Sequence, residues 1–269
     1  MRLRFNPFQI FRSSKTPAGL YARKKWLQEQ NTAPWKADFK DTVQKLLSLQ
    51  ASDGSWGHSV VETVQRLFGL HLTVRAQSEP IVKGLEWLLY NTLEAFPRKR
   101  VNLRESLRPE ALKNLPFTMG CARLFMTGVT LFLASIFGRE NDEKILELYE
   151  SLNQLNIKNN GRWCGWSCSN NILRAFVVHP TYAKSKAVDL AVGALAGIQH
   201  QSGEWPRQIS FYQTVNALAH LDIQQADAQL EKAFNRIYET QGHDGTWGRS
   251  HKEWKTFLVI HALKNKKEL

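Results

Sequence analysis

The chain has 269 residues, of which 43% are hydrophobic, so it lies within the globular range and is long enough to bury a large core. Its three cysteines, an odd number with no extracellular framework, exclude a disulfide scaffold and favour a reducing compartment. The formal net charge of +12 favours a phosphate-bearing partner, whether a nucleic acid, an anionic membrane or a diphosphate substrate. A solvated basic surface explains the same charge without any partner.

Residues 1–35 are expected to form a basic N-terminal arm. No acidic residue precedes Glu29, and Phe5, Phe8 and Phe11 interleave with arginines, a mixture that suits docking on a surface such as an anionic membrane. The stretch has no continuous apolar core and therefore does not read as a secretory signal, although a transit peptide would look similar. We expect a flexible or packed arm on a cytoplasmic protein, with peripheral attachment to a membrane as an alternative.

Apolar spacing over residues 36–269 predicts a single all-α domain without strands. The expected helices span residues 38–50, 60–74, 80–96, 103–115, 119–138, 142–156, 168–178, 184–199, 210–221, 225–239 and 252–265. Amphipathic helices such as 142–156 alternate with helices that are apolar almost all round, such as 252–265, and the second kind is typical of a helix surrounded by protein. This alternation predicts two concentric layers.

The helix expected at 119–138 is the most apolar segment of the chain. Fifteen residues from Leu124 to Gly138 carry no charge, which is short of the roughly 20 needed to span a bilayer. We interpret the segment as a buried inner helix, with insertion into a membrane as the alternative.

A motif of the form Q-x-x-[DS]-G-x-W recurs between helices. It spans residues 50–56, 199–205 and 241–247, and a degenerate copy without the glutamine contains Asn160, Gly161 and Trp163. Trp163, Trp205 and Trp247 are each 42 residues apart, and a fixed period of this size indicates a repeat architecture. The longer interval from Trp56 to Trp163 indicates that one copy has eroded.

The residues of the motif suit a tight corner between two helices. Gly54 supplies the backbone freedom for a sharp turn, and Asp53 can accept hydrogen bonds from turn amides. Trp56 offers a flat face that can lie against the Gln50 amide and clamp adjacent units. The motif is therefore interpreted as a device for stability.

The motif resembles the QW repeats of the terpenoid cyclase and protein prenyltransferase superfamily over about residues 38–265. Thr63, Thr214 and Thr256, which follow their tryptophans at the start of an apolar helix, fit the same pattern. The resemblance implies an α/α toroid of about five to six helical hairpins, as in the squalene–hopene cyclases, with inner and outer helices around an apolar cavity. It implies an isoprenoid or other apolar ligand, with or without a diphosphate, and allows a protein partner subunit.

The family's catalytic motifs do not carry over to this chain. The D-x-D-D acid motif of class II cyclases, the Asp-x-Cys of zinc-dependent prenyltransferases and the D-D-x-x-D/E of class I enzymes are all absent from the sequence. The cofactor therefore stays open, with zinc and magnesium as the candidates.

Because the inner helices begin just after each tryptophan, their N-termini should converge on one rim of the cavity and favour an anion. At this rim we expect a ligand or cofactor site formed by His58, Trp166, Arg207, Tyr212 and His251. His71, His220 and His261 lie on helix bodies and are expected to be core groups or to support the residues of the site.

Two kinds of chemistry are considered at the rim. Cys164 and Cys168 are four residues apart and, with His58 or His251, approximate zinc ligation; buried cysteines more often act as small hydrophobes. Glu62 or Glu253 would act as a catalytic acid if an apolar cavity raised its pKa; the alternative is a helix-surface carboxylate.

Three functions follow from these features. The first is a cyclase-like or prenyltransferase-like protein that holds an isoprenoid, with catalysis left open. The second is a non-catalytic binding or scaffold protein that retains the toroid. The third, nucleic-acid binding, lacks any recognition motif in the sequence.

Overall fold

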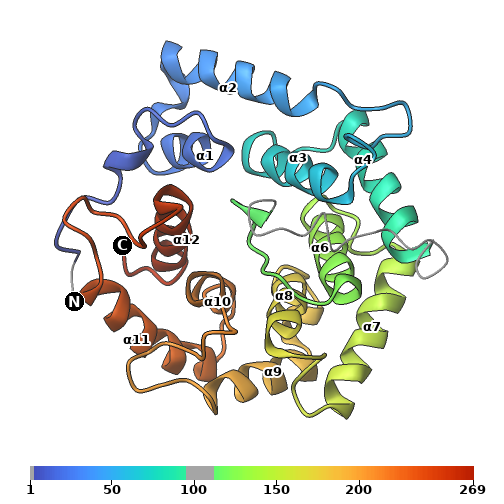
Figure 1. Cartoon of the computed structure of the whole chain (residues 1–269), viewed down its shortest axis with the longest axis vertical. Coiled ribbons are helices and arrows are strands. Elements are labelled where there is room, and N and C mark those ends of the chain that lie inside the picture. The colour runs from blue at the N-terminus through green and yellow to red at the C-terminus, as the bar shows by residue number, and fades with distance from the viewer. Residues whose placement is uncertain (1–2, 95–111) are drawn as a thin grey trace. The chain divides into compact units, whose positions relative to one another are not determined.

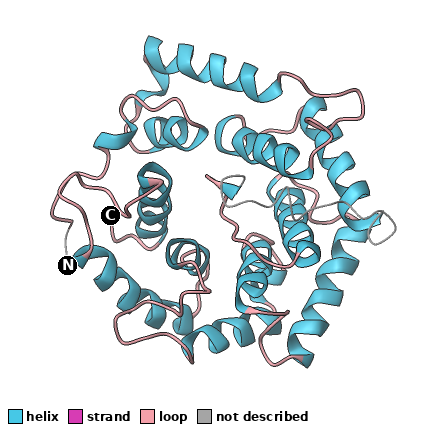
Figure 2. Cartoon of the chain, in the orientation of Figure 1, coloured by secondary structure: helices cyan, strands magenta, loops and turns pink. Residues whose placement is uncertain are grey.

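The computed structural model describes residues 3–94 and 112–269, and in these residues it contains eleven α-helices and no strand (Figure 2). The chain divides into two compact units, which are described separately below. The smaller unit comprises Pro7–Leu115, and the larger comprises Met1–Asn6 with Pro116–Leu269. The part of the helix expected at 103–115 that precedes Leu112, and the basic run at 97–100, lie outside the described residues.

The smaller unit is organised around α3 (Val60–Thr73), which packs against α1 (Pro17–Lys25), α2 (Ala33–Leu47) and α4 (Glu79–Leu89). Short 3-10 helices precede α1 and α2, at Gln9–Phe11 and Glu29–Asn31, and a π-helical turn, Tyr90–Glu94, follows α4. Of these α-helices, α1 alone is absent from the sequence-based prediction.

Helix α1 carries a buried cation and packs into the smaller unit. Arg23 is 3% exposed and forms ion pairs with Glu29 at 2.7 Å and Asp38 at 2.8 Å. Thr16 caps the helix by accepting a hydrogen bond from the amide of Gly19. Phe8 and Phe11 pack edge-on against Trp26, so these apolar residues of the N-terminal arm contact the protein itself.

The larger unit has two layers of helices (Figure 1). One layer contains α6 (Ala122–Ile136), α8 (Trp166–Phe176), α10 (Phe211–Leu218) and α12 (Lys252–Asn265), each packed against the next. The other contains α7 (Glu143–Lys158), α9 (Lys186–Ala196) and α11 (Gln224–Glu239), again packed in order. A 3-10 helix, Tyr182–Lys184, precedes α9.

Burial separates the two layers of the larger unit as their sequences predict. From Phe125 to Ser135 every residue of α6 is buried, and α12 buries most of its length. In α7 only Ile145, Tyr149, Leu152 and Asn156 are buried, a stripe at helical spacing. We call these the buried layer (α6, α8, α10, α12) and the solvent-facing layer (α7, α9, α11); in the smaller unit α2 and α4 have the solvent-facing pattern.

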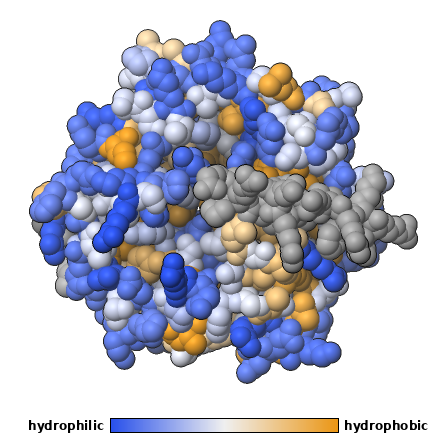
Figure 3. All heavy atoms as spheres, viewed as in Figure 1, coloured by the Kyte–Doolittle hydropathy of each residue, from blue (hydrophilic) through white to orange (hydrophobic). Residues whose placement is uncertain are grey.

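The apolar segment around α6 is a helix of 15 residues, as the interpretation of a buried helix expects. Among the described residues no helix is both long and apolar enough to cross a membrane. On the face drawn in Figure 3 the described side chains are mainly hydrophilic and the hydrophobic ones form separate patches. The exposed large hydrophobic residues are Leu49, Tyr90, Met119, Leu155, Ile157 and Leu269.

The four corners each contain a glycine with positive φ, and at the first three corners this glycine touches the next solvent-facing helix. Gly54 has φ +91°, and a Cβ there would lie 2.4 Å from the carbonyl oxygen of Lys83 in α4. Gly203 has φ +84°, and its Cβ would lie 2.3 Å from the carbonyl oxygen of Lys232 in α11. Only glycine allows this close approach without strain. Gly161, in the degenerate copy, has φ +95° and the same relation to α9.

The corner glutamines connect neighbouring helices through hydrogen bonds. Gln50 donates to the carbonyl of Gly54 at 2.8 Å and to that of Pro80 in α4 at 2.7 Å. Gln199 likewise donates to Gly203 at 3.0 Å and to Gln229 in α11 at 2.9 Å. The glutamine therefore links neighbouring repeats, and the ring of Trp56, which was predicted to clamp them, also lies against Gly84 of α4.

The corner tryptophans bind the helix that precedes them. The indole N–H groups of Trp56, Trp163, Trp205 and Trp247 donate to the carbonyls of Ser48, Leu152, Leu195 and Ile237, at 2.8–3.1 Å. The amide of Trp56 donates to Thr63 and that of Trp247 to Thr256, which explains the downstream threonine. Asp53 accepts from the amide and hydroxyl of Ser55, as expected of a turn aspartate.

The last corner binds the start of the chain instead of another helix. Gln241 accepts hydrogen bonds from the amides of Arg4 at 2.9 Å and Phe5 at 3.1 Å, and donates to the carbonyl of Phe5 at 2.9 Å. The Phe5 ring also packs edge-on against His243. The first described residues of the arm are thus packed within the larger unit.

Replacing Gly203 by alanine should lower the free energy of unfolding by about 2–4 kcal/mol, because the new Cβ meets a backbone carbonyl and the φ angle is strained. Chemical denaturation of this variant and of its control, monitored by circular dichroism, measures the change in unfolding free energy. Gly193→Ala is the matched control: in helix α9 its Cβ would meet nothing closer than 3.6 Å, and it should raise stability by about 0.5–1 kcal/mol. Equal denaturation midpoints for the two variants would contradict the role of the corner glycine.

Candidate functional site

The three cysteines of the chain lie together at the start of helices α6 and α8. The sulfur atoms of Cys121, Cys164 and Cys168 are all within 4.8 Å of one another. Cys121 and Cys164 are exposed and Cys168 is buried. Among the described residues no histidine or carboxylate belongs to this group. We call these residues the cysteine cluster.

The corner at Trp163 positions two of the three thiols. Cys164 directly follows the corner tryptophan, and Cys168 lies in the first turn of α8. Ser169 accepts hydrogen bonds from the amides of Trp163 at 3.1 Å and Cys164 at 3.4 Å, in the place that threonine takes at other corners. The cluster is therefore attached to the element that defines the repeat.

An extended segment before α6 positions the third thiol. Asn171 of α8 accepts a hydrogen bond from the amide of Thr118 at 2.9 Å and donates to its carbonyl at 2.8 Å. Gln213 of α10 donates to the carbonyl of Phe117 at 3.1 Å. These contacts hold the segment against α8, so that the amide of Cys121 donates to the sulfur of Cys168 at 3.0 Å.

The electrostatics of the cluster disfavour three free thiolates. Burial raises the pKa of Cys168 to about 12, and the neighbouring cysteines add to the effect because a second negative charge there would be repelled. Opposing this, Cys121 is the N-cap of α6 and Cys168 is in the first turn of α8, where helix dipoles favour negative charge. Without a cation, the buried member of the cluster is a neutral thiol at neutral pH.

Cys164 and Cys168 were predicted from the sequence as metal ligands, and Cys121 was not. The two were chosen for their spacing on one helix, whereas Cys121 is brought to them by the fold from 47 residues away. The available signal was that Cys121 directly precedes the long apolar helix α6, and that Cys164 lies two residues before α8. The histidine expected beside them, from His58 or His251, is not a member of the cluster.

His58 and Glu62 are part of the first corner, in the smaller unit. The His58 ring nitrogen lies 3.1 Å from Asp53, and its side chain is 73% exposed. Glu62 forms an ion pair with Arg66 at 3.3 Å, one helical turn along α3. Both side chains have local structural partners, and no described contact joins them to a ligand-sized pocket. Their roles in binding and catalysis stay predictions.

The other predicted rim residues lie at three places in the larger unit. Trp166 is within the cysteine cluster's helix, with the guanidinium of Arg162 5.2 Å from its ring centroid. The ring of Tyr212 lies under the ammonium group of Lys255, at 5.7 Å, and burial raises the pKa of its hydroxyl. Arg207 and His251 are exposed, and Glu253, at the start of α12, is half-buried. These contacts leave the expected ligand site and the catalytic role of Glu253 as predictions.

A second group, missed as a site by the sequence analysis, lies toward the C-terminal ends of the buried-layer helices. Arg174 of α8 is 7% exposed, and its guanidinium carbon lies 5.6 Å from the Phe132 ring centroid. Burial, and next the charge of Arg174, lower the pKa of His220 well below its usual value. The His220 and His261 rings are 5.3 Å apart, and Asn216 lies 3.3 Å from the His261 ring nitrogen. We call these four residues the buried basic group.

The buried basic group has unsatisfied polar atoms. Nε and Nη1 of Arg174, Nε2 of His220 and Oδ1 of Asn216 have no hydrogen-bond partner among the described residues. Arg174 forms no ion pair within that part of the chain, and burial alone lowers its pKa to about 10. Buried polar atoms are nearly always paired in proteins, so this cluster is a candidate for binding a ligand.

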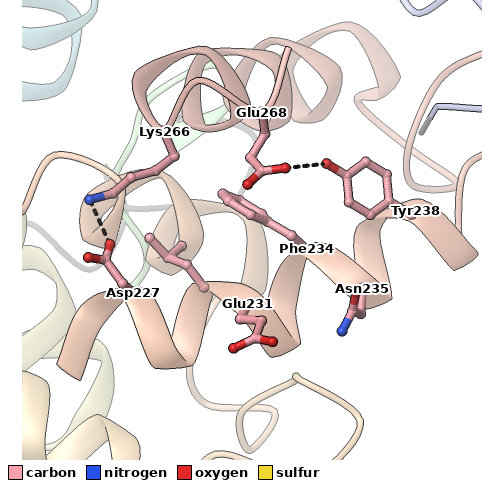
Figure 4. Close-up of a pocket in the computed structure, with 8 residues that line it drawn as sticks. Asp227, Glu231, Phe234, Asn235, Tyr238, Lys266 and Glu268 are labelled. Atoms are coloured by element: carbon pink, nitrogen blue, oxygen red, sulfur yellow. Dashed lines mark hydrogen bonds and ion pairs between the residues drawn. The ribbon is translucent and has the colours of Figure 1, made fainter. Parts of the chain in front are cut away.

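A separate open pocket of about 490 Å³ lies between α11 and the C-terminal residues. Figure 4 shows that its walls are largely polar: Lys266 pairs with Asp227 at 2.8 Å, and Tyr238 donates to Glu268 at 3.3 Å. None of the predicted site residues lines it. Four of the polar side chains drawn there pair with one another, which makes the pocket a weaker candidate than the buried basic group.

Comparison with solved structures supports the fold. A crystal structure of a protein from Actinoplanes matches with a TM-score of 0.59 at 17% identity, covering 96% of this chain and 90% of that one. A type II terpene cyclase from Scytonema, in complex with its substrate geranylgeranyl dihydroxybenzoate, matches with a TM-score of 0.61 at 13% identity, covering 95% and 87%. No protein-family model matches the sequence, and no curated protein matches it either.

Together with the helical content of the described residues, these likenesses confirm the predicted all-α fold of the α/α toroid class. The fold is terpenoid cyclase-like, and at these identities the comparison extends to the fold alone.

Replacing Asn171 by alanine should release the segment that covers Cys168. The change removes two hydrogen bonds and leaves the amide and carbonyl of Thr118 unpaired, at a cost of about 1–3 kcal/mol in unfolding free energy. In chelator-treated protein we expect faster alkylation of Cys168, measured by mass spectrometry, with little change at exposed Cys164. Asn170→Ala is the control, because Asn170 bonds Thr214 on α10 instead. Unchanged Cys168 alkylation in the Asn171 variant would show that the segment is held by other contacts.

Proposed function

We propose that the protein binds a ligand with an isoprenoid chain and an anionic group. The proposal rests first on the terpenoid cyclase-like fold and on corners that resemble QW repeats. The Scytonema cyclase that shares this fold is described with a geranylgeranyl chain attached to dihydroxybenzoate, an apolar chain with a polar aromatic end. A helical layer that is apolar almost all round supports a ligand of this class.

Arg174 is the observation that carries the anionic half of the proposal. An unpaired buried charge costs several kcal/mol, and removing one partner from a buried pair typically costs about 3–5 kcal/mol. Within the described residues Arg174 has an aromatic ring and a neutralised histidine beside it, but no carboxylate. A diphosphate or carboxylate group on the ligand would supply the missing counter-ion and accept the two unpaired guanidinium N–H groups.

Arg174 also belongs to the buried layer, where an isoprenoid would be held. Asn170, one helical turn before it, accepts a hydrogen bond from Thr214 of α10 at 3.3 Å, and Arg174 itself lies over a ring of α6. The same helix turns Phe176 toward Tyr149 of the solvent-facing layer, with ring centroids 5.1 Å apart. The guanidinium is thus on the face of α8 that its buried-layer neighbours share.

The protein could either bind this ligand without changing it or convert it to a cyclic product. The D-x-D-D acid motif is absent from the sequence, which favours a non-catalytic binding protein as the alternative function. If the protein is a cyclase, Glu62 or Glu253 is the proposed acid. Product analysis after incubation with geranylgeranyl diphosphate distinguishes these functions: a cyclised product that Glu253→Gln or Glu62→Gln abolishes identifies the acid, and unaltered substrate favours binding alone.

Arg174→Met tests the proposal directly, because methionine keeps an unbranched apolar side chain and removes the charge. Affinity for geranylgeranyl diphosphate, measured by titration calorimetry, should fall by tenfold or more, since a charge-assisted hydrogen bond contributes about 1.5–3 kcal/mol. Affinity for geranylgeraniol, which lacks the anion, should stay unchanged. The unliganded variant should be as stable as the wild type or more so, because a buried unpaired charge has been removed.

Arg162→Met is the matched control, since this exposed arginine packs over Trp166 outside the buried basic group. It should leave both affinities unchanged. Failure of the wild-type protein to bind either prenyl compound would refute the proposal, and an equal loss of both affinities in Arg174→Met would assign Arg174 a structural role.

A further inference from the structure

We infer that Cys121, Cys164 and Cys168 bind one zinc ion through their three sulfur atoms, with the fourth position open to water or a ligand donor atom. The inference stands on the cysteine cluster alone and does not depend on binding of an isoprenoid.

The geometry of the cluster is close to that of a zinc site. Zn–S bonds of about 2.3 Å in a tetrahedral arrangement place sulfur atoms about 3.8 Å apart. The three sulfur atoms already lie within 4.8 Å of one another, so a closure of about 1 Å completes the site. Cys121 and Cys164 are exposed, so we expect rotation of their side chains to provide this closure.

The surroundings of the cluster suit metal-bound thiolates. The amide of Cys121 donates a hydrogen bond to the sulfur of Cys168, an outer contact of the kind that orients metal ligands. Gly120 makes this approach possible, since a Cβ there would lie 3.1 Å from the same sulfur. The N-termini of α6 and α8 both meet the cluster, and their dipoles favour its negative charge.

The donor atoms select the metal. Three sulfur atoms without a carboxylate or histidine favour a soft or borderline cation and disfavour magnesium, which requires oxygen ligands. Zinc takes three protein ligands when a fourth position is kept for water or substrate. Because two of the three cysteines are exposed, this open position is accessible from solvent. A cation there also removes the mutual repulsion of three thiolates.

The test is zinc binding by the reduced, chelator-treated full-length chain, followed with a chromophoric competitor and by elemental analysis. We expect one zinc ion per chain. Cobalt(II) in place of zinc should give thiolate-to-metal charge-transfer bands and the intense visible bands of tetrahedral coordination. Each of three single variants should lower zinc affinity on the order of a hundredfold: Cys121→Ser, Cys164→Ser and Cys168→Ser.

Two controls separate loss of a ligand from loss of the fold. Met119→Ser removes an exposed sulfur two residues from Cys121, and should leave zinc binding unchanged. Cys121→Ser and Cys164→Ser alter exposed positions, so their circular dichroism should match that of the wild type. His251→Ala should also keep full affinity, because His251 is outside the cluster.

Several outcomes would overturn the inference: no zinc bound by the wild type, selective binding of copper(I) instead, or full zinc affinity in any one of the three cysteine variants. A stable disulfide between Cys121 and Cys164 under reducing conditions would do the same. No prenyl compound enters the experiment, so failure of the proposed ligand leaves its result unaffected.

Discussion

The close contact of Gly54, Gly161 and Gly203 with a backbone carbonyl of the next solvent-facing helix is the constraint on which the fold depends. A side chain at Gly54 or Gly203 would occupy the space of that carbonyl, so helix spacing at the corner is set by the absence of a Cβ. The glutamine amide can bridge its own corner and the neighbouring helix only at this spacing. Tryptophan then ties the corner to the helix before it. The corners at Gly54 and Gly203 thus each fix three helices relative to one another, which is a physical reason for the sequence to repeat there.

The corner at Trp163 positions two of the three thiols of the cysteine cluster. Ser169 replaces threonine as the acceptor for the corner amides, so the start of α8 is fixed relative to Trp163. Cys164 and Cys168 lie on either side of that fixed point. The third thiol depends on a different contact, the pair of hydrogen bonds between Asn171 and Thr118. A local repeat element and the long-range contacts of Asn171 and Gln213 together create a cluster that neither would create alone.

Local features of the sequence predicted the helices and corners because those depend on neighbours within one or two turns. Helix α3 was expected at 60–74 and spans Val60–Thr73, and α12 was expected and found at residues 252–265. Helix α1 was missed because its last turn is strongly basic; Arg23 is buried there between Glu29 and Asp38, which follow it by 6 and 15 residues. Cys121 and Arg174 were missed because their roles depend on residues that only the fold brings near them. A thiol gains a role only when two others approach it, and a buried arginine differs from an exposed one only in its surroundings.

Helix α8 carries one residue of the cysteine cluster in its first turn and one residue of the buried basic group in its last turn, so its dipole acts on both. Its first turn carries Cys168, where the helix dipole favours negative charge, and its last turn carries Arg174, where the dipole favours positive charge. Such an effect is worth about 0.3–1 kcal/mol, or about 2 kcal/mol in partly buried geometries. Burying an unpaired charge costs several kcal/mol, so the dipole cannot stabilise either group by itself. Three thiolates at one end therefore require a cation, and the guanidinium at the other requires an anion. Because the two requirements have opposite sign and lie at opposite ends of one helix, the proposed cation and the proposed anionic ligand would occupy separate sites.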